Sequence, residues 1–473
     1  MQTVNVLPNN RGVPNQLQVP DQPVHVGGEG KIYFTIDSKY VVKIYHRPSP
    51  EKKAKLEHVL TLGRNLGEAE RFLAWPLGIV NQLGNQSSLG VVTRFVPYDT
   101  LGKLAQYPWL AARQLKEGHN WLNYVKMARS VATAVATLHN KGIAHTDLSF
   151  KNFLADIKSG EVVLIDLDGV VVRGFLAPEV LGTPKFLAPE LAMEVAKKRQ
   201  AERAGKQYSR QVQPSQESDR HSAAVIILWT LLYRNVMAPV LCYDDEDAIL
   251  DDALGYGQFA CFSEDPHDRR NWFRDIGAPF IKQGYPSYRI LTPRLQELTQ
   301  EALVENLHNP GKRPPVREWE WALADSYDAL APCRACGQSL FYPYWVQPRL
   351  RRCPFCGAGH QPPLPSVVEL LEEHQKGMHR VVRTAVFYHG LPLFTDVTIP
   401  GTRPPFTRRG TPIIGQVVWD SKEGVHRLVN NGDTPWRVIA GGSGTVGRGA
   451  SVALRRGVLL SFGDGKRLAR VVE

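Results

Sequence analysis

The sequence predicts an α+β protein with several domains, and three observations carry this prediction. Near the N-terminus, apolar residues that alternate with polar ones indicate strands around a glycine-rich turn at residues 27–30. Residues 121–139 have apolar side chains at helical spacing, which predicts a buried helix. Residues 380–473 contain many short strand patterns separated by glycines, which predicts a small β-sandwich or barrel.

The composition is that of a globular chain with more than one core. The 473 residues are 43% hydrophobic and 22% charged, which allows about two to four domains. No apolar run is long enough to cross a bilayer, and the N-terminal residues lack the blocks of a secretory signal. We therefore expect a cytoplasmic protein that makes no contact with membranes.

The net charge of +11 is concentrated near the C-terminus. From Lys376 onwards, fifteen Lys and Arg residues face six Asp and Glu residues. A basic module favours an acidic partner, although a solvated basic surface has the same composition. We expect a protein partner and do not expect nucleic acid.

Residues 145–152, HTDLSFKN, place Asp147 and Asn152 five residues apart directly after the predicted helix. Phosphoryl transfer uses a carboxylate that orients the attacking hydroxyl and a nearby oxygen ligand that holds Mg²⁺. Asp147 suits the first role and Asn152 suits the second. The segment resembles the catalytic loop of eukaryotic-type protein kinases, with Thr146 and Ser149 where that family usually has Arg and Lys.

The glycine turn and the strand after it match the same family. Without side chains, Gly27, Gly28 and Gly30 would let backbone amides close over nucleotide phosphates. Lys43 follows in the apolar context Val-Val-Lys-Ile. It resembles the kinase strand lysine that contacts the α- and β-phosphates of ATP.

Two further parts of a nucleotide site follow from this resemblance. The next helix should supply a glutamate that pairs with the strand lysine, for which Glu57 is our choice and Glu51 the fallback. Residues 90–97 would form the strand and hinge behind the adenine. Thr93 would lie near the back of this pocket, with Phe95 in the hinge.

A strand pattern at residues 161–165 ends in Asp166-Leu167-Asp168-Gly169, fourteen residues after Asn152. In kinases the carboxylate at this place chelates Mg²⁺ or Mn²⁺. We assign the metal to Asp166 because this residue directly ends the strand. Asp168 is the second candidate ligand.

Segments farther along the chain complete the resemblance. Residues 182–190, GTPKFLAPE, match the end of a kinase activation segment, and Asp219 resembles the aspartate that fastens the catalytic loop. Arg313 resembles the late arginine that pairs with a glutamate equivalent to Glu190. The ordered matches, which extend over about 290 residues, predict a bilobal protein-kinase fold that uses ATP.

The first functional hypothesis is an active Ser/Thr protein kinase that phosphorylates protein hydroxyls. The alternative is a pseudokinase or nucleotide-binding scaffold, because Ser149 lacks the charge that would neutralise the γ-phosphate. A third reading, a small-molecule phosphotransferase of the aminoglycoside type, shares the H-x-D loop. Such enzymes lack the segment seen here at 182–190, which argues against this reading.

Four of the six cysteines form two close pairs, Cys333 with Cys336 and Cys353 with Cys356, sixteen residues apart. In a reducing cytosol this spacing favours zinc over disulfides. Four thiolates leave no open coordination position, so we predict a structural Zn²⁺.

Four short motifs together resemble those of a bacterial branch of Hanks-type Ser/Thr kinases: GGEG, HxDLSxKN, LIDxDG and GTPxFxAPE. Some members carry a zinc ribbon after the kinase. They accompany a von Willebrand A-domain protein and a PPM-type phosphatase in systems associated with tellurite resistance. The resemblance implies these two partners. Residues 427–431 and 454–463 also resemble the second half of a forkhead-associated domain, which implies an interaction module.

These observations predict an order of domains along the chain. We expect an extended lead-in at 1–20, kinase lobes at 21–97 and 98–328, a four-cysteine zinc ribbon at 329–362, a linker with a helix pattern at 363–379, and a β-sandwich at 380–473. The phosphoryl-transfer groups are complete by Arg313. We therefore expect a chain that ends near Ala329 to bind ATP, with the later modules serving partners or regulation.

Overall fold

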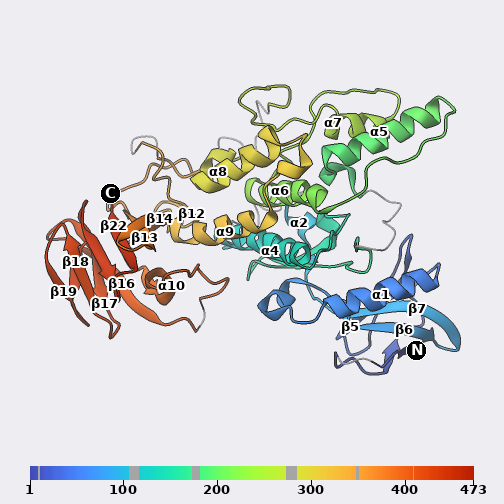
Figure 1. Ribbon diagram of the computed structural model, residues 1–473, viewed down its shortest axis with the longest axis horizontal. Helices are drawn as coiled ribbons and strands as arrows, with labels where there is room; N and C mark the ends of the chain where they lie inside the picture. The colour runs from blue at the N-terminus through green and yellow to red at the C-terminus, as the bar shows by residue number, and fades with distance from the viewer. Residues whose placement is uncertain are drawn as a thin grey trace. The chain divides into compact units, whose positions relative to one another are not determined.

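The structure is a computed structural model that describes residues 1–8, 11–105, 115, 117–172, 182–272, 285–347, 351–408 and 410–473. Its helices and antiparallel sheets confirm the predicted α+β class (Figure 1). The chain divides into two compact units. The first contains Met1–Ala111, Met127–Arg274 and Thr299–Arg317, and the second contains Ala112–Lys126, Asp275–Leu298 and Glu318–Glu473. The region predicted as one kinase lobe, 98–328, is therefore divided between two units.

A seven-stranded antiparallel sheet forms the N-terminal part of the first unit, in the order β2-β1-β6-β7-β5-β4-β3. Its strands are β1 (Gln2–Val6), β2 (Gln16–Val19), β3 (His25–Val26), β4 (Gly30–Phe34), β5 (Tyr40–Tyr45), β6 (Gly78–Leu83) and β7 (Gln86–Arg94). Val42, Val80 and Val92 form part of the core on one face. The register pairs Lys43 with Ile32 of β4 and with Val91 of β7, which places the lysine beside the glycine turn and the predicted hinge.

Residues 1–20 are not the extended lead-in that the sequence suggested. β1 pairs with both β2 and β6, and Val4 and Val19 are completely buried. Apolar residues alternate with polar ones in both strands, which buries one face of the pair. Prolines and polar residues around these short strands hid this period in the sequence.

Helix α1 (Pro50–Leu62) follows the Lys43 strand and begins as predicted. The Ser49 hydroxyl accepts a hydrogen bond from the Lys52 amide at 3.1 Å, and Pro50 occupies the first turn. The helix ends at Gly63, where a Cβ atom would lie 2.1 Å from Nε1 of Trp75. A glycine is required there because the indole of Trp75 packs against the end of the helix.

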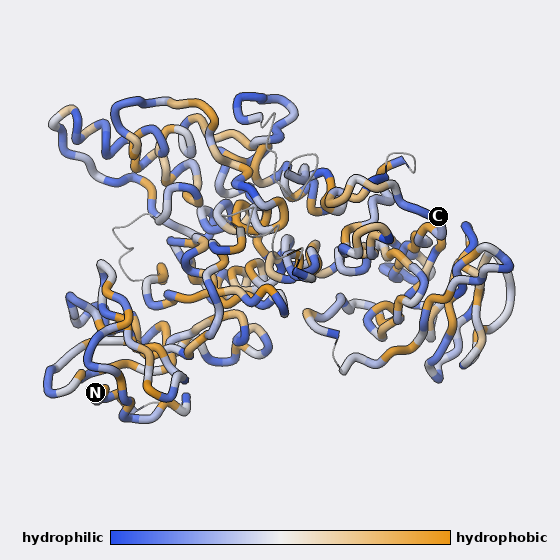
Figure 2. Tube along the Cα trace, turned by 180° about the vertical axis from the view of Figure 1, so that it is seen from behind, coloured by the Kyte–Doolittle hydropathy of each residue, from blue (hydrophilic) through white to orange (hydrophobic). Residues whose placement is uncertain are grey.

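The rest of the first unit is mainly helical. Its elements are the small sheet β10-β9-β8 (Glu161–Leu164, Phe153–Asp156, Asp99–Thr100) and the helices α2 (Leu101–Ala105), α4 (Trp121–Asn140), α5 (Pro189–Arg203), α6 (Gln216–Leu232) and α7 (Ala248–Tyr256). The boundaries between the units fall inside three helices, α4, α8 (Pro293–Gln300) and α9 (Val316–Ser326). The short helix η5 (Glu301–Glu305) belongs to the first unit. Apolar side chains predicted to be core are buried along α4. Figure 2 shows apolar residues mainly on the inner helices and strands and polar residues on the outer loops.

The second unit contains a short hairpin, β11 (Leu330–Pro332) and β12 (Ser339–Phe341), and two larger antiparallel sheets. The first sheet has the order β14-β13-β22-β21-β18-β19 (Met378–Phe387, Ser366–Gln375, Arg467–Val471, Leu459–Phe462, Trp436–Ala440, Gly444–Val446). The second has the order β15-β16-β17-β20 (Pro392–Phe394, Ile413–Asp420, Val425–Asn430, Ser451–Ala453), with α10 (Thr395–Thr398) after β15. Leu370, Val417, Leu428 and Leu460 belong to one core that the two sheets share, so the C-terminal module is a β-sandwich.

The linker predicted at 363–379 is wrong, as is its helix pattern. Residues from Ser366 onwards form β13, which pairs with β14 on one side and β22 on the other. Val368 and Leu370 are buried in the sandwich core. The local spacing of apolar and acidic residues favours a helix, but pairing on both sides with distant strands outweighs this local preference.

Candidate active site

A cavity of about 730 Å³ lies in the first unit, between the seven-stranded sheet and the segment that follows α4. The predicted residues that line it are Gly27, Gly28, Gly30, Lys43, Thr93, Phe95, Asn152, Asp166 and Asp168. The structure therefore gathers most of the predicted site residues around one cavity, although they lie as far apart in sequence as Gly27 and Asp168.

The glycine turn joins β3 and β4 and lines this cavity. The Gly27 amide donates to the Gly30 carbonyl at 2.9 Å, which closes the turn. A Cβ atom on Gly30 would lie 2.3 Å from the Ile44 carbonyl oxygen, whereas one on Gly28 would meet nothing within 4 Å. A glycine is thus required at position 30 because the backbone of β5 lies so close. At position 28 the absence of a side chain leaves the backbone accessible.

Lys43 is the centre of the charged groups in the cavity. Its Nζ lies 2.7 Å from Asp166 Oδ1, 2.9 Å from Asp168 Oδ2 and 3.0 Å from Glu29 Oε2. Burial alone would lower the pKa of Lys43, but the three carboxylates outweigh burial and raise the pKa above its ordinary value. The lysine is therefore a permanent positive charge.

The structure does not bring Glu57 to Lys43, contrary to the sequence prediction. Glu57 lies on the exposed face of α1, where it pairs with Lys53 at 3.9 Å, and 55% of its side chain is exposed. Glu51, the fallback, is exposed in the first turn of the helix. The core-facing residues Leu56 and Val59 determine which face of α1 turns inward, and that face carries no glutamate.

Asp166 and Asp168 flank a buried leucine and have different surroundings. Asp166 has a left-handed backbone with φ of 63°, and 42% of its side chain is exposed. Only 4% of the Asp168 side chain is exposed, and the Tyr45 hydroxyl donates to its Oδ2 at 2.5 Å. Burial would raise the pKa of Asp168, but the Lys43 charge and the Tyr45 hydroxyl outweigh burial and lower the pKa to about 2. The Asp166 pKa is raised, first by loss of surrounding water and then by the Asp168 charge.

Asp147 is held by three side chains from its own segment and from residue 183. Asn152 Nδ2 donates to the Asp147 backbone carbonyl at 2.8 Å and to Oδ2 at 3.3 Å. The Thr183 hydroxyl donates to Oδ1 at 2.9 Å, and Lys151 Nζ lies 2.8 Å from Oδ2. The carboxylate is therefore fixed in position close to Lys151 and Asn152, which line the cavity.

Asp219 of α6 fixes the backbone of the same segment. Its side-chain oxygens accept hydrogen bonds from the amides of His145 at 2.7 Å and Thr146 at 3.3 Å. Thr146 has a left-handed backbone with φ of 71°, a conformation that costs energy for a β-branched residue. These hydrogen bonds to a buried carboxylate stabilise that strained backbone.

Lys151 is a site residue that the sequence interpretation missed. Ser149, at the position where the kinase family usually has Lys, is 1% exposed, and its hydroxyl has no partner among the described residues. Lys151 instead places its ammonium group beside Asp147 and lines the cavity. Its spacing of four residues from Asp147 was a signal available in the sequence.

The segment at 182–190 is anchored as expected. Nη1 and Nη2 of Arg313 lie 2.8 Å and 2.6 Å from the two carboxylate oxygens of Glu190, and the arginine side chain is completely buried. The bidentate pair fixes the start of α5. Residues 173–181, between Asp168 and this segment, lie outside the described residues.

The four predicted zinc ligands form a compact cluster in the second unit. Sγ of Cys333 lies 3.8 Å from Sγ of Cys356, and Sγ of Cys336 lies 3.7 Å from Sγ of Cys353. Four thiolates at the usual Zn–S length of about 2.3 Å around a tetrahedral ion lie about 3.8 Å apart. Gly337 and Gly357 follow the two pairs with left-handed backbones, and their amides donate to the Cys333 and Cys353 carbonyls. The cluster therefore fits a Zn²⁺ ion.

The first cysteine knuckle also caps helix α4. The Trp121 amide, at the start of α4, donates to the Gln338 side chain at 2.9 Å, and the Ser339 amide donates to Asn120 Oδ1 at 3.1 Å. The Trp121 ring is 0% exposed and packs against Phe341 and Phe355, with ring centroids 5.0 Å and 5.8 Å away. The cysteine module and the first turn of α4 thus share a core.

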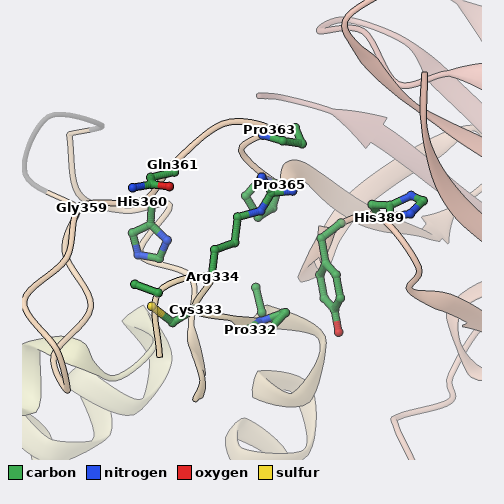
Figure 3. A pocket seen from close by; sticks show the side chains of 12 residues that line it. Pro332, Cys333, Arg334, Gly359, His360, Gln361, Pro363, Pro365 and His389 are labelled. Atoms are coloured by element: carbon green, nitrogen blue, oxygen red, sulfur yellow. The ribbon is translucent and has the colours of Figure 1, made fainter. Parts of the chain in front are cut away.

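A smaller pocket of about 120 Å³ lies beside Cys333 (Figure 3). Figure 3 shows Arg334, His360 and His389 around it. Arg334 Nη1 donates to the Pro362 carbonyl at 2.6 Å, which ties the knuckle to the chain that leads into the sandwich. This pocket is too small for a nucleotide and contains none of the predicted phosphoryl-transfer residues.

Comparison with known sequences shows which domain family part of the first unit resembles. The family model of the protein kinase domain matches residues 79–246, which is less than half of the chain. Residues 79–246 are therefore similar to the protein kinase domain. No helix among the described residues has the length and apolar character that a membrane crossing needs.

Curated relatives are also kinases. A "Dual serine/threonine and tyrosine protein kinase" of Apis mellifera is 31% identical over 77 residues, which are 16% of this chain and 8% of that protein. A "Probable serine/threonine-protein kinase WNK8" of Oryza sativa subsp. japonica is 39% identical over 66 residues, 14% of this chain and 11% of that protein. The match thus spans only about a tenth of the length of these relatives.

Proposed function

We propose that this chain is a protein kinase that transfers the γ-phosphate of ATP to Ser or Thr hydroxyls of proteins. The observation that carries this proposal is the environment of Asp147. Its carboxylate is fixed by Thr183, Asn152 and Lys151. The last two of these residues line the cavity together with Lys43 and Asp166. A fixed carboxylate can accept the proton of an incoming hydroxyl, and the nearby cations can bind phosphates.

The cavity and its donors fit ATP and Mg²⁺. Its volume of about 730 Å³ is in the range of small-molecule sites, and the apolar residues near Thr93 and Phe95 suit a purine. The Asn152 amide nitrogen is bonded to Asp147, which leaves its carbonyl oxygen as a metal ligand. Together with the more exposed Asp166, it would hold Mg²⁺, which neutralises phosphate charge when bound.

A protein substrate is supported by the segment at 182–190. Thr183 bonds to Asp147, and Glu190 is locked by Arg313, so this segment is fastened both to the reacting carboxylate and to the helical core. A polypeptide laid along the segment would present its hydroxyl to Asp147. A small-molecule phosphotransferase does not need such a platform.

The direct test is transfer of labelled phosphate. We expect the purified chain with labelled ATP and Mg²⁺ to phosphorylate itself or a generic protein, and mass spectrometry should locate the phosphate on Ser or Thr. Transfer to Tyr would change the proposed specificity. Binding of ATP without any transfer would favour a scaffold role instead.

Lys151 should contribute to the transfer because Ser149 carries no charge. We expect Lys151→Ala to lower kcat by about tenfold or more with a smaller change in KM for ATP, since the ammonium group would stabilise charge that develops on the phosphate. Lys151→Arg should retain most activity. Ser149→Ala is the matched control, and an equal loss in this variant would contradict the assignment to Lys151.

We further propose that the four-cysteine cluster holds structural zinc and that the β-sandwich is a forkhead-associated-like partner-binding module. The sulfur geometry supports the zinc, and the two-sheet core supports an independently built interaction surface. The resemblance described above to bacterial kinases suggests a von Willebrand A-domain protein and a PPM-type phosphatase as partners. A cytoplasmic location would keep the four thiols reduced for metal binding.

A further inference from the structure

The predicted nucleotide-binding lysine lacks a carboxylate partner on helix α1. Protein kinases hold the corresponding lysine with a glutamate from the helix after the lysine strand. Here two lysines of α1 interact with Tyr45 and Asp168 instead. Lys52 Nζ lies 4.1 Å from the centre of the Tyr45 ring, and the half-buried Lys55 has a pKa that burial lowers and the Asp168 charge partly restores.

We infer that Asp168 is the positioning residue for Lys43 and supplies the buried negative charge that α1 does not provide. Asp168 Oδ2 lies 2.9 Å from Lys43 Nζ and accepts the Tyr45 hydroxyl hydrogen bond. Tyr45 is itself buried two residues after Lys43 on β5, so one strand presents both donors to one carboxylate. The inference rests on the proposed function, in which Lys43 contacts ATP phosphates.

The two carboxylates of this segment then have separate roles. Mg²⁺ retains several water ligands and needs an accessible oxygen, which fits the 42% exposed Asp166 side chain. The Asp168 side chain is 4% exposed, and its Oδ2 is already engaged by two donors. Asp168 is therefore assigned to Lys43 and not to the metal, for which the sequence suggested it as a second ligand.

Glu29 is a weaker candidate for the same role. It reaches Lys43 Nζ at 3.0 Å from the glycine turn, but 57% of its side chain is exposed. Ion pairs at exposed positions are screened by water and stabilise little. A buried partner on a strand-linked segment fixes the position of the lysine, whereas an exposed partner on a turn does not.

The test measures binding of ADP without metal, so that loss of a metal ligand has no effect on the readout. We expect Asp168→Asn to weaken metal-free ADP binding by at least about tenfold, because Lys43 loses its buried partner. Asp166→Asn should leave metal-free binding near wild type but raise the Mg²⁺ concentration needed for transfer. Glu57→Gln should change neither quantity.

Moving the negative charge from residue 168 to helix α1 tests whether Asp168 positions Lys43 or only stabilises the fold. In the Asp168→Asn background, Lys55→Glu would place a carboxylate at the α1 position whose charge interacts with that of Asp168. We expect this second change to restore part of the ADP affinity. Lys53→Glu in the same background makes the same change of charge on the exposed face and should restore nothing. Tyr45→Phe, which spares every charge, should weaken ADP binding in the same direction but less.

The outcomes distinguish this inference from the proposed function. Metal-free ADP binding by Asp168→Asn that equals or exceeds the wild type, together with an increased Mg²⁺ requirement, would show a metal ligand and overturn the inference. An equal loss in Glu57→Gln would also overturn it. If the wild type binds ADP but transfers no phosphate, the kinase proposal fails, and the Asp168 assignment is still decided by the binding data.

Discussion

Asp147→Asn should reduce phosphoryl transfer by about a thousandfold while ADP binding stays within about twofold of wild type. The amide has the shape of the carboxylate and retains an oxygen that can accept the Thr183 hydroxyl hydrogen bond. It cannot accept a proton from an incoming hydroxyl, and it removes the charge that pairs with Lys151. Initial rates with labelled ATP and ADP titrations measure the two quantities.

The matched control for this variant is Asp99→Asn. Asp99 belongs to the same unit and also pairs with a lysine four residues away, Lys103, at 2.6 Å, but the pair is exposed to solvent. The control should transfer phosphate at the wild-type rate. An Asp147→Asn variant as active as this control would show that another group accepts the proton.

The parts of the site that could be predicted from the sequence are those with fixed local spacing. Asp147 and Asn152 are five residues apart in one segment, and the two cysteine pairs each define a turn, so their chemistry follows from short patterns. Lys43 was identifiable because a lysine in an apolar strand needs a reason to be there. The structure places Lys43 and Asn152 in the lining of one cavity, Asp147 beside Asn152, and the four cysteines in one cluster.

The remainder depends on pairing between distant segments, which sequence spacing does not encode. The identity of the Lys43 partner required knowing which face of α1 turns inward and that Asp168 lies beside Tyr45. The strands at residues 1–20 and 366–375 form because distant strands pair with them, and their local patterns were polar or helix-like. The packing of Phe341 against Trp121 joins segments more than two hundred residues apart.

Removal of zinc should destabilise helix α4 as well as the cysteine module. This changes the expectation that a chain ending near Ala329 binds ATP. Such a chain lacks Phe341 and Phe355 and would expose the Trp121 ring, which is completely buried. It would also lose the Gln338 cap at the start of α4, the helix that leads to the Asp147 segment. Loss of a buried aromatic contact of this kind costs about 3 to 5 kcal/mol of unfolding free energy.

We therefore expect Cys353→Ser, or treatment with a zinc chelator, to lower the unfolding temperature by several degrees. Metal content and phosphoryl transfer should fall together, because zinc-thiolate modules fold only with their metal. Phe341→Ala should lower the unfolding temperature similarly while retaining about one zinc per chain. Cys242→Ser, an exposed cysteine outside the cluster, is the matched control and should match the wild type in stability and zinc content. If the zinc-free protein kept both the wild-type unfolding temperature and the wild-type transfer rate, the module would serve only partners or regulation, as the sequence alone suggested.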